Sequence, residues 1–89
     1  DDRTITDAGY ELLNITGIHS SFVFVKIGDE VLISGRSLGD INVQVLLESL
    51  GGGGHMTMAG AKLKSVSIEE AVEKLENAID KYLMEGEEK

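Results

Sequence analysis

Four consecutive glycines followed by a histidine, Gly51 to His55, form the part of this sequence best suited to chemistry. Glycine loses more backbone entropy on folding than any other residue and adds no packing, so a run of it needs another explanation. Without Cβ atoms, consecutive N–H groups can form a concave nest that holds an anionic oxygen. The imidazole of His55 would add a further donor. The run therefore predicts an anion site; a flexible linker or a long helix C-cap with an incidental histidine is the alternative.

Arg36 and Ser37 form a second candidate pair, because they follow a predicted strand and precede a predicted helix. Arginine presents a planar fork of N–H donors that suits phosphate, and serine adds a hydroxyl. Taken alone, Arg36 is better explained as a surface residue paired with Asp40 or Glu48. Together with the glycine run it favours a binding site, provided that the fold brings the two segments together.

No catalytic or metal-binding set can be assembled from the remaining residues. The two histidines, His19 and His55, lie far apart in the sequence, and neither has acidic ligands at metal-binding spacing. The absence of cysteine excludes a disulfide framework, a thiolate metal site and a cysteine nucleophile. No serine or threonine stands in a nucleophile elbow. We therefore predict no catalytic residue, bound metal or cofactor in this segment.

The net charge of −8 is concentrated at the two ends of the chain. Residues 1–30 hold six acids and two bases, residues 31–66 two acids and three bases, and residues 67–89 eight acids and three bases, giving −4, +1 and −5. A long nucleic acid needs an extended basic face, so it is disfavoured as a ligand. The central region, which contains both candidate segments, can still hold a small anion.

The length of 89 residues allows a single domain, residues 1–89, with no apolar run near the roughly 20 residues of a membrane span. Apolar spacing and capping residues predict its elements. They are a helix over 6–14, strands over 18–27 and 30–37 joined by a turn at 28–29, a helix over 41–50 capped by Asp40 and ended by Gly51, a strand over 57–66, and a helix over 67–85 begun by a capping box of Ser67 and Glu70. We expect an α/β (α+β) fold, a small mixed sheet with helices packed on it in the order α-β-β-α-β-α.

Three segments of the central region carry a family resemblance: 33–43 (ISGRSLGDINV), 50–55 (LGGGGH) and 59–61 (AGA). In this order and spacing, they resemble the C-terminal DHH-associated domain of the DHH phosphoesterases. That superfamily includes single-strand exonucleases, oligoribonucleases and membrane-anchored cyclic-di-AMP phosphodiesterases. The resemblance covers nearly the whole chain and is strongest with the cyclic-di-AMP branch, because of the RSLGDINVQ segment and the four glycines before the histidine.

The resemblance implies a two-lobed enzyme of which this chain is the substrate-binding lobe. An N-terminal DHH catalytic lobe in the same parent chain would bind manganese and hydrolyse a cyclic dinucleotide or a short oligonucleotide, while this lobe closes over the substrate. Met58 departs from the pattern, since many relatives have a small alanine there, and this bears on packing behind the loop and on nucleotide fit. The residues that match the family's substrate-contacting positions are Arg36, Ser37, Asn42, Gly52, Gly53, Gly54 and His55.

The resemblance also implies a cytoplasmic domain without membrane contact of its own, in a parent protein anchored in the bacterial cell membrane and able to form oligomers. Three alternatives remain at this point. One is a noncatalytic nucleic-acid-binding domain, as in the related C-terminal domain of alanyl-tRNA synthetases. Another is the corresponding lobe of an oligoribonuclease or single-strand exonuclease. The third is an interaction domain in which the glycine run is only a hinge.

Overall fold

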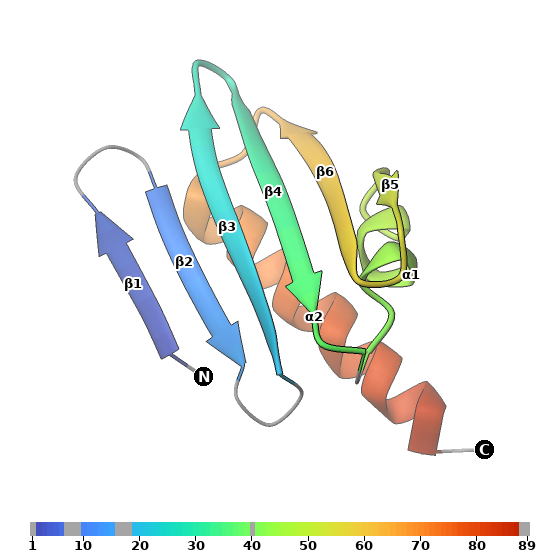
Figure 1. Cartoon of the computed structure of the whole chain (residues 1–89). Coiled ribbons are helices and arrows are strands. Elements are labelled where there is room, and N and C mark those ends of the chain that lie inside the picture. Colours follow the sequence, from blue (N-terminus) through green and yellow to red (C-terminus); the bar gives the residue numbers. More distant parts are fainter. Residues whose placement is uncertain (1, 7–9, 16–18, 40, 88–89) are drawn as a thin grey trace.

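The chain folds, in a computed structural model, into one six-stranded sheet with two helices (Figure 1). The structure describes residues 2–6, 10–15, 19–39 and 41–87. The strand order is β1-β2-β3-β4-β6-β5, and every neighbouring pair is antiparallel. In chain order the elements are β1 (Asp2–Thr6), β2 (Tyr10–Ile15), β3 (Ser20–Ile27), β4 (Glu30–Ser37), α1 (Val43–Glu48), β5 (Gly53–Gly54), β6 (Met58–Lys64) and α2 (Ile68–Glu87).

The α+β class is confirmed, but the predicted helix over 6–14 is wrong. The segment belongs to β1 and β2, and residues 7–9 lie outside the described residues. In β2, Leu13 is buried opposite Phe22 of β3, whereas its neighbour Leu12 is only half-buried, as the alternation of a strand requires. Pairing with β3 outweighs a weak local helical pattern. The prediction of a mixed sheet is also wrong, because every described strand pair is antiparallel. The element order is β-β-β-β-α-β-β-α in place of the predicted α-β-β-α-β-α.

The other predicted elements are confirmed with shifted ends. The capping box of α2 is present: the Ser67 N–H donates to the Glu70 carboxylate over 3.0 Å, and the Glu70 N–H donates to the Ser67 hydroxyl over 3.0 Å. Helix α1 begins at Val43, later than predicted, because Asn42 caps it by accepting the Val45 N–H over 3.3 Å. Residue 40, the predicted cap, lies outside the described residues.

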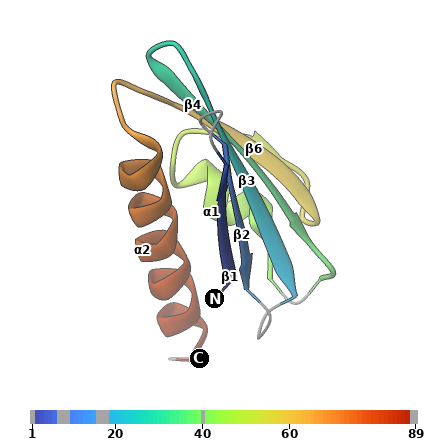
Figure 2. The same cartoon turned by 90° about the vertical axis from the view of Figure 1, so that its left-hand side faces the viewer.

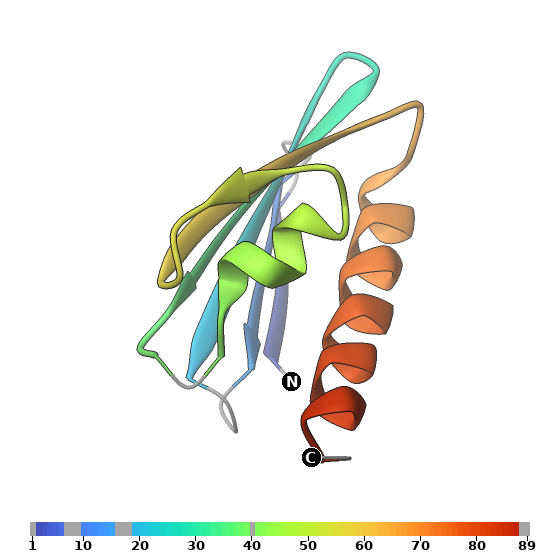
Figure 3. The same cartoon turned by 90° about the vertical axis from the view of Figure 1, so that its right-hand side faces the viewer.

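Both helices pack on the same face of the sheet, which Figures 2 and 3 show from two sides. The core lies between the sheet and the two helices, and it is formed by alternate residues of the strands and by the inner faces of the helices. Its largest buried side chains are Leu13, Phe22, Phe24, Val31, Ile33, Val43, Leu46, Leu47, Val72 and Leu75. Neither helix of the described chain has the length and hydropathy that a membrane span requires.

The opposite face of the sheet, here called the open face, carries the other alternate residues, and neither helix of the described residues covers it (Figure 2). From the register of β3, β4, β6 and β5, its members include Val23, Val25, Leu32, Ser34, Arg36, Met58, Gly60, Lys62, Lys64 and Gly53. The described residues therefore form a sheet with one helix-covered face and one open face.

Candidate anion-binding site on the open face

Strand β6 brings the two candidate segments together. Arg36 near the end of β4 is the register partner of Met58 in β6. On the other side of β6, Gly53 and Gly54 of β5 pair with Gly60 and Ala59. The chain leaves β4, crosses the covered face as α1, and returns as β5 beyond the place that β6 then fills (Figures 1 and 3). Arg36 and the glycine run thus lie on either side of one strand.

Arg36, Met58 and His55 form a row across the open face, here called the site row. The His55 and Met58 backbones exchange hydrogen bonds of 2.6 and 3.3 Å, so their side chains lie on the same face. The Ser37 N–H donates to the Thr57 carbonyl over 3.1 Å, which makes the adjacent pair of Arg36 and Met58 non-hydrogen-bonded. Side chains of such a pair are close together. At about 4.8 Å between strands, the Cα atoms of Arg36 and His55 are about 10 Å apart.

Two of the four glycines are required by packing against β6. A Cβ atom on Gly52 would clash with the Gly60 carbonyl oxygen and lie 2.7 Å from Ala61 Cα. A Cβ atom on Gly54 would lie 2.5 Å from Ala59 Cα, and its φ of +148° also disfavours a side chain. A Cβ atom on Gly53, by contrast, would meet nothing within 4 Å. Of Gly52, Gly53 and Gly54, only Gly53 could therefore carry a side chain without a clash inside the protein.

The predicted nest of N–H groups is wrong for three donors of the run. All three donate to backbone carbonyl oxygens. The Gly51 N–H donates to that of Glu48 over 3.0 Å, and the Gly52 N–H to that of Leu47 over 2.8 Å. The His55 N–H donates to that of Met58 over 2.6 Å. Gly51 does take the left-handed backbone predicted after a helix, with a φ of +89°. These three donors are therefore not available to an anion.

Arg36 and His55 are both exposed, and no ion pair holds Arg36 among the described residues. The pairing with Glu48 considered from the sequence is not formed, and residue 40 lies outside the described part of the chain. On the open face, the described side chains of β4 and β6 include three bases, Arg36, Lys62 and Lys64, and one acid, Glu30, which contacts Lys62 at 4.0 Å. The open face is locally basic in a chain of net charge −8.

Ser37 and Asn42 are used inside the fold. Ser37 is 8% exposed, and its hydroxyl accepts the Gly39 N–H over 3.0 Å and the Ile41 N–H over 3.5 Å. The Asn42 side-chain oxygen caps α1, and the Asn42 N–H donates to the Tyr82 hydroxyl over 3.1 Å. The structure therefore places these two predicted contact residues as supports of the loop after Arg36 and does not bring them into the site row.

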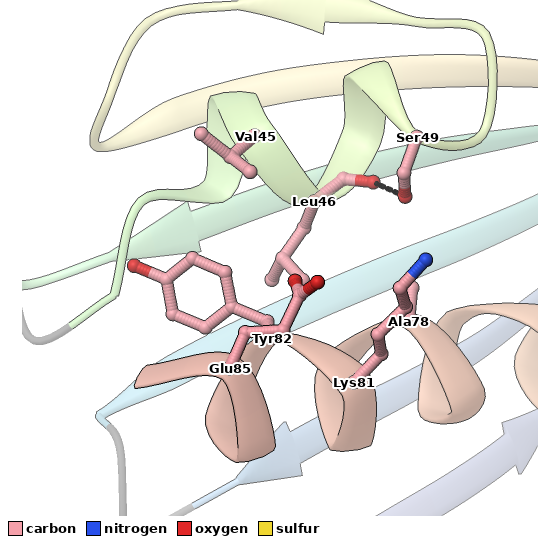
Figure 4. Close-up of a pocket in the computed structure, with 7 residues that line it drawn as sticks. All are labelled: Val45, Leu46, Ser49, Ala78, Lys81, Tyr82 and Glu85. Atoms are coloured by element: carbon pink, nitrogen blue, oxygen red, sulfur yellow. Dashed lines mark hydrogen bonds between the residues drawn. The ribbon is translucent and has the colours of Figure 1, made fainter. Parts of the chain in front are cut away.

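A groove on the covered side lies between α1 and α2 (Figure 4). In Figure 4 the Tyr82 ring lies beneath the first turn of α1, and Lys81 and Glu85, which are both exposed, extend from α2. The groove is lined by Val45, Leu46, Ser49, Ala78, Lys81, Tyr82 and Glu85. Sequence reasoning placed Tyr82 on the apolar face of α2 and missed its bond to Asn42, because no local pattern signals a partner 40 positions away.

The chain is similar in sequence to a known domain family and to several characterised proteins. The profile of the DHHA1 domain matches residues 2–85. The cyclic-di-AMP phosphodiesterase GdpP of Geobacillus thermodenitrificans is 47% identical over 87 residues, which cover 97% of this chain and 13% of that protein. The cyclic-di-AMP phosphodiesterase PdeA of Listeria monocytogenes is 50% identical over 72 residues, covering 80% of this chain and 11% of that protein.

A third relative has a different activity. The bifunctional oligoribonuclease and PAP phosphatase NrnA of Thermus thermophilus is 39% identical over 62 residues, which cover 68% of this chain and 19% of that protein. In all three comparisons the chain spans less than a fifth of the relative's length.

Proposed function

The chain belongs to the DHHA1 domain family, and from that membership we propose that it is the substrate-binding lobe of a phosphodiesterase that cleaves a cyclic dinucleotide, cyclic-di-AMP. The relatives named as cyclic-di-AMP phosphodiesterases support this substrate. The observation that carries the proposal is the site row, in which Arg36 and His55 flank Met58 on the open face.

Side chains supply the phosphate contacts in this proposal. The guanidinium of Arg36 offers two parallel N–H donors to one phosphate, and the imidazole of His55 offers a third from the other end of the row. Their Cα atoms are about 10 Å apart with Met58 between them, so a phosphate that both side chains hold lies above the Met58 side chain. Gly53 lies beside the row with open space where a side chain would be, so the ligand can approach the backbone there.

Hydrolysis is assigned to another part of the parent protein. We expect a DHH catalytic lobe in the same chain to supply manganese and the attacking water, with this lobe closing over the substrate. Among the described residues, no three His, Cys, Asp or Glu side chains gather where they could hold a metal ion. The cytoplasmic position of this lobe and the membrane anchor of the parent belong to the same proposal.

A second candidate function is the corresponding lobe of an oligoribonuclease, supported by the relative of that name. Lys62 and Lys64 continue the basic side chains along β6 beyond the site row, and a linear oligonucleotide could use them where a cyclic dinucleotide could not reach. The two candidates differ in the ligand that the open face prefers.

Titration of the 89-residue chain followed by NMR amide shifts tests the proposal. The ligands are inorganic phosphate, cyclic-di-AMP, its linear product and a short oligoribonucleotide. We expect cyclic-di-AMP to shift Gly53, His55 and Met58, and Arg36→Ala to weaken binding with an unchanged fold. Preference for the oligoribonucleotide would favour the second candidate. Absence of any shift in the site row with every ligand would refute both.

A further inference from the structure

The side chain between Arg36 and His55 in the site row is a methionine, and it is 49% exposed. A large apolar side chain loses favourable free energy when half of it faces water, and nothing in the fold uses the exposed half. Its backbone, by contrast, is fully used: its N–H and carbonyl pair with His55. The Met58 side chain is thus free to contact a ligand.

Next to Met58, the open face carries only very small side chains. The following residues on this face are Ser34 of β4, Gly60 of β6 and Gly53 of β5, which lie side by side in the register. None of them has a side chain larger than a hydroxymethyl group. The result is a floor formed largely by backbone, bordered on one side by the site row.

A base attached to a phosphate would fit this combination of groups. Phosphate needs N–H donors such as those of Arg36 and His55, whereas a nucleobase has two flat apolar faces that need a flat surface or a polarizable side chain. The thioether of methionine makes favourable contacts with aromatic rings. Inorganic phosphate or a sugar phosphate would leave Met58 and the glycine floor without a partner.

We propose that Met58 contacts the nucleobase of a bound nucleotide, with the base lying over the floor of Gly53, Gly60 and Ser34 while Arg36 and His55 hold its phosphate. This inference rests on the proposed function and adds the residue that distinguishes a nucleotide from other phosphates. It also changes the interpretation of the sequence departure at Met58. The Met58 side chain lies on the open face beside His55, so in this proposal it contacts the base and does not pack beneath the glycine run.

Binding of 5′-AMP and of ribose 5-phosphate to the 89-residue chain separates the base contact from the phosphate contact. We expect Met58→Ala to lower the affinity for 5′-AMP about three- to tenfold and to lower the ratio of the two affinities by the same factor. Met58→Leu should recover most of the loss, because it restores an apolar side chain of similar size. Met84→Ala, at a residue 61% exposed on α2, is the matched control and should change neither affinity.

Three results of these binding measurements would contradict the proposals. Equal weakening of both ligands by Met58→Ala would overturn the base contact, because the side chain would then act on the phosphate alone. Unchanged 5′-AMP affinity in Met58→Ala would also overturn it. If the wild-type chain binds neither ligand, the proposed function itself fails. A spectrum of dispersed amide signals for each variant verifies that the fold is kept.

Discussion

The backbone N–H of Asn42 donates to the hydroxyl of Tyr82 over 3.1 Å, joining the first turn of α1 to α2 across 40 positions of sequence. Asn42 also caps α1 through its side chain. Because α1 leads directly into the glycine run, this bond ties the position of the loop to the best-specified helix of the chain. The site row therefore depends on the covered face, although no residue of that face takes part in it.

Removal of the Tyr82 hydroxyl should destabilise the protein modestly. In Tyr82→Phe the Asn42 N–H loses its acceptor at a partly buried position, and we expect the free energy of unfolding to fall by about 1 kcal/mol. Urea unfolding followed by circular dichroism measures the change. Asn77→Ala, at an exposed position of the same helix, should stay within about 0.5 kcal/mol of the wild type. An equal loss in both variants would show that the bond contributes nothing specific.

Alanine at Gly52 should be poorly tolerated. Its Cβ atom would clash with the Gly60 carbonyl oxygen and with Ala61, so the β5–β6 pairing must shift. We expect a loss of about 2 kcal/mol or more in the free energy of unfolding, because the clash is with backbone that cannot rotate away. Thermal unfolding of the 89-residue chain is the measurement, and wild-type stability would mean that the loop packs differently.

Alanine at Gly53 should separate folding from binding. Its Cβ atom meets nothing in the protein, so stability should remain within about 0.5 kcal/mol of the wild type. The added methyl group would stand on the floor where the ligand is proposed to lie, and binding of 5′-AMP should weaken. Parallel measurements of melting temperature and NMR-detected affinity test both statements. Wild-type affinity in Gly53→Ala would argue against close approach of a ligand at this residue.

Substitution of Arg36 should affect binding without affecting the fold. The side chain is exposed and has no ion-pair partner among the described residues, so Arg36→Ala should unfold like the wild type. Loss of a charge-assisted contact to phosphate should lower affinity for cyclic-di-AMP about 10- to 100-fold. Arg36→Lys should recover only part of this, since an ammonium group lacks the planar fork. Full recovery by lysine would show that charge alone is needed.

The capping box should make stability depend on pH through Glu70. Its pKa is lowered from the ordinary value of 4.5, first because its carboxylate accepts the Ser67 backbone N–H and then because of the Ser67 hydroxyl contact. A carboxyl group with a lowered pKa in the folded state contributes stability above its unfolded pKa. That contribution is lost as the pH falls below 4.5 through the lowered value.

Urea midpoints at pH 7 and at pH 3.5 test this dependence. Glu70→Gln should remove part of the fall in stability between these two pH values, because the neutral side chain does not titrate. Glu69→Gln removes the same charge at the neighbouring residue, which makes no contact with Ser67 among the described bonds, and should keep the fall. Identical pH profiles for the two variants would contradict a role of the capping box.

Local patterns were enough for the elements whose signals lie within a few residues. The hairpin of β3 and β4 was predicted from two β-rich runs around Gly28 and Asp29, and α2 from its apolar face and its Ser67–Glu70 box. The N-terminal segment failed this approach. A few apolar residues there fit a helix by spacing, but the edge of β3 offered hydrogen bonds that only the folded chain makes available.

The chemical types at the site were determined by the sequence itself: an arginine after a strand, a glycine run that ends in histidine, and a middle region that is not acidic. Tertiary structure decided which of them meet. Strand β6 pairs with β5 through a short turn, but it pairs with β4 across more than 20 positions of sequence, and this second pairing places Arg36 in one row with Met58 and His55. The same packing buries Ser37, whose hydroxyl accepts N–H groups of the loop after β4, and uses the Asn42 side-chain oxygen to cap α1.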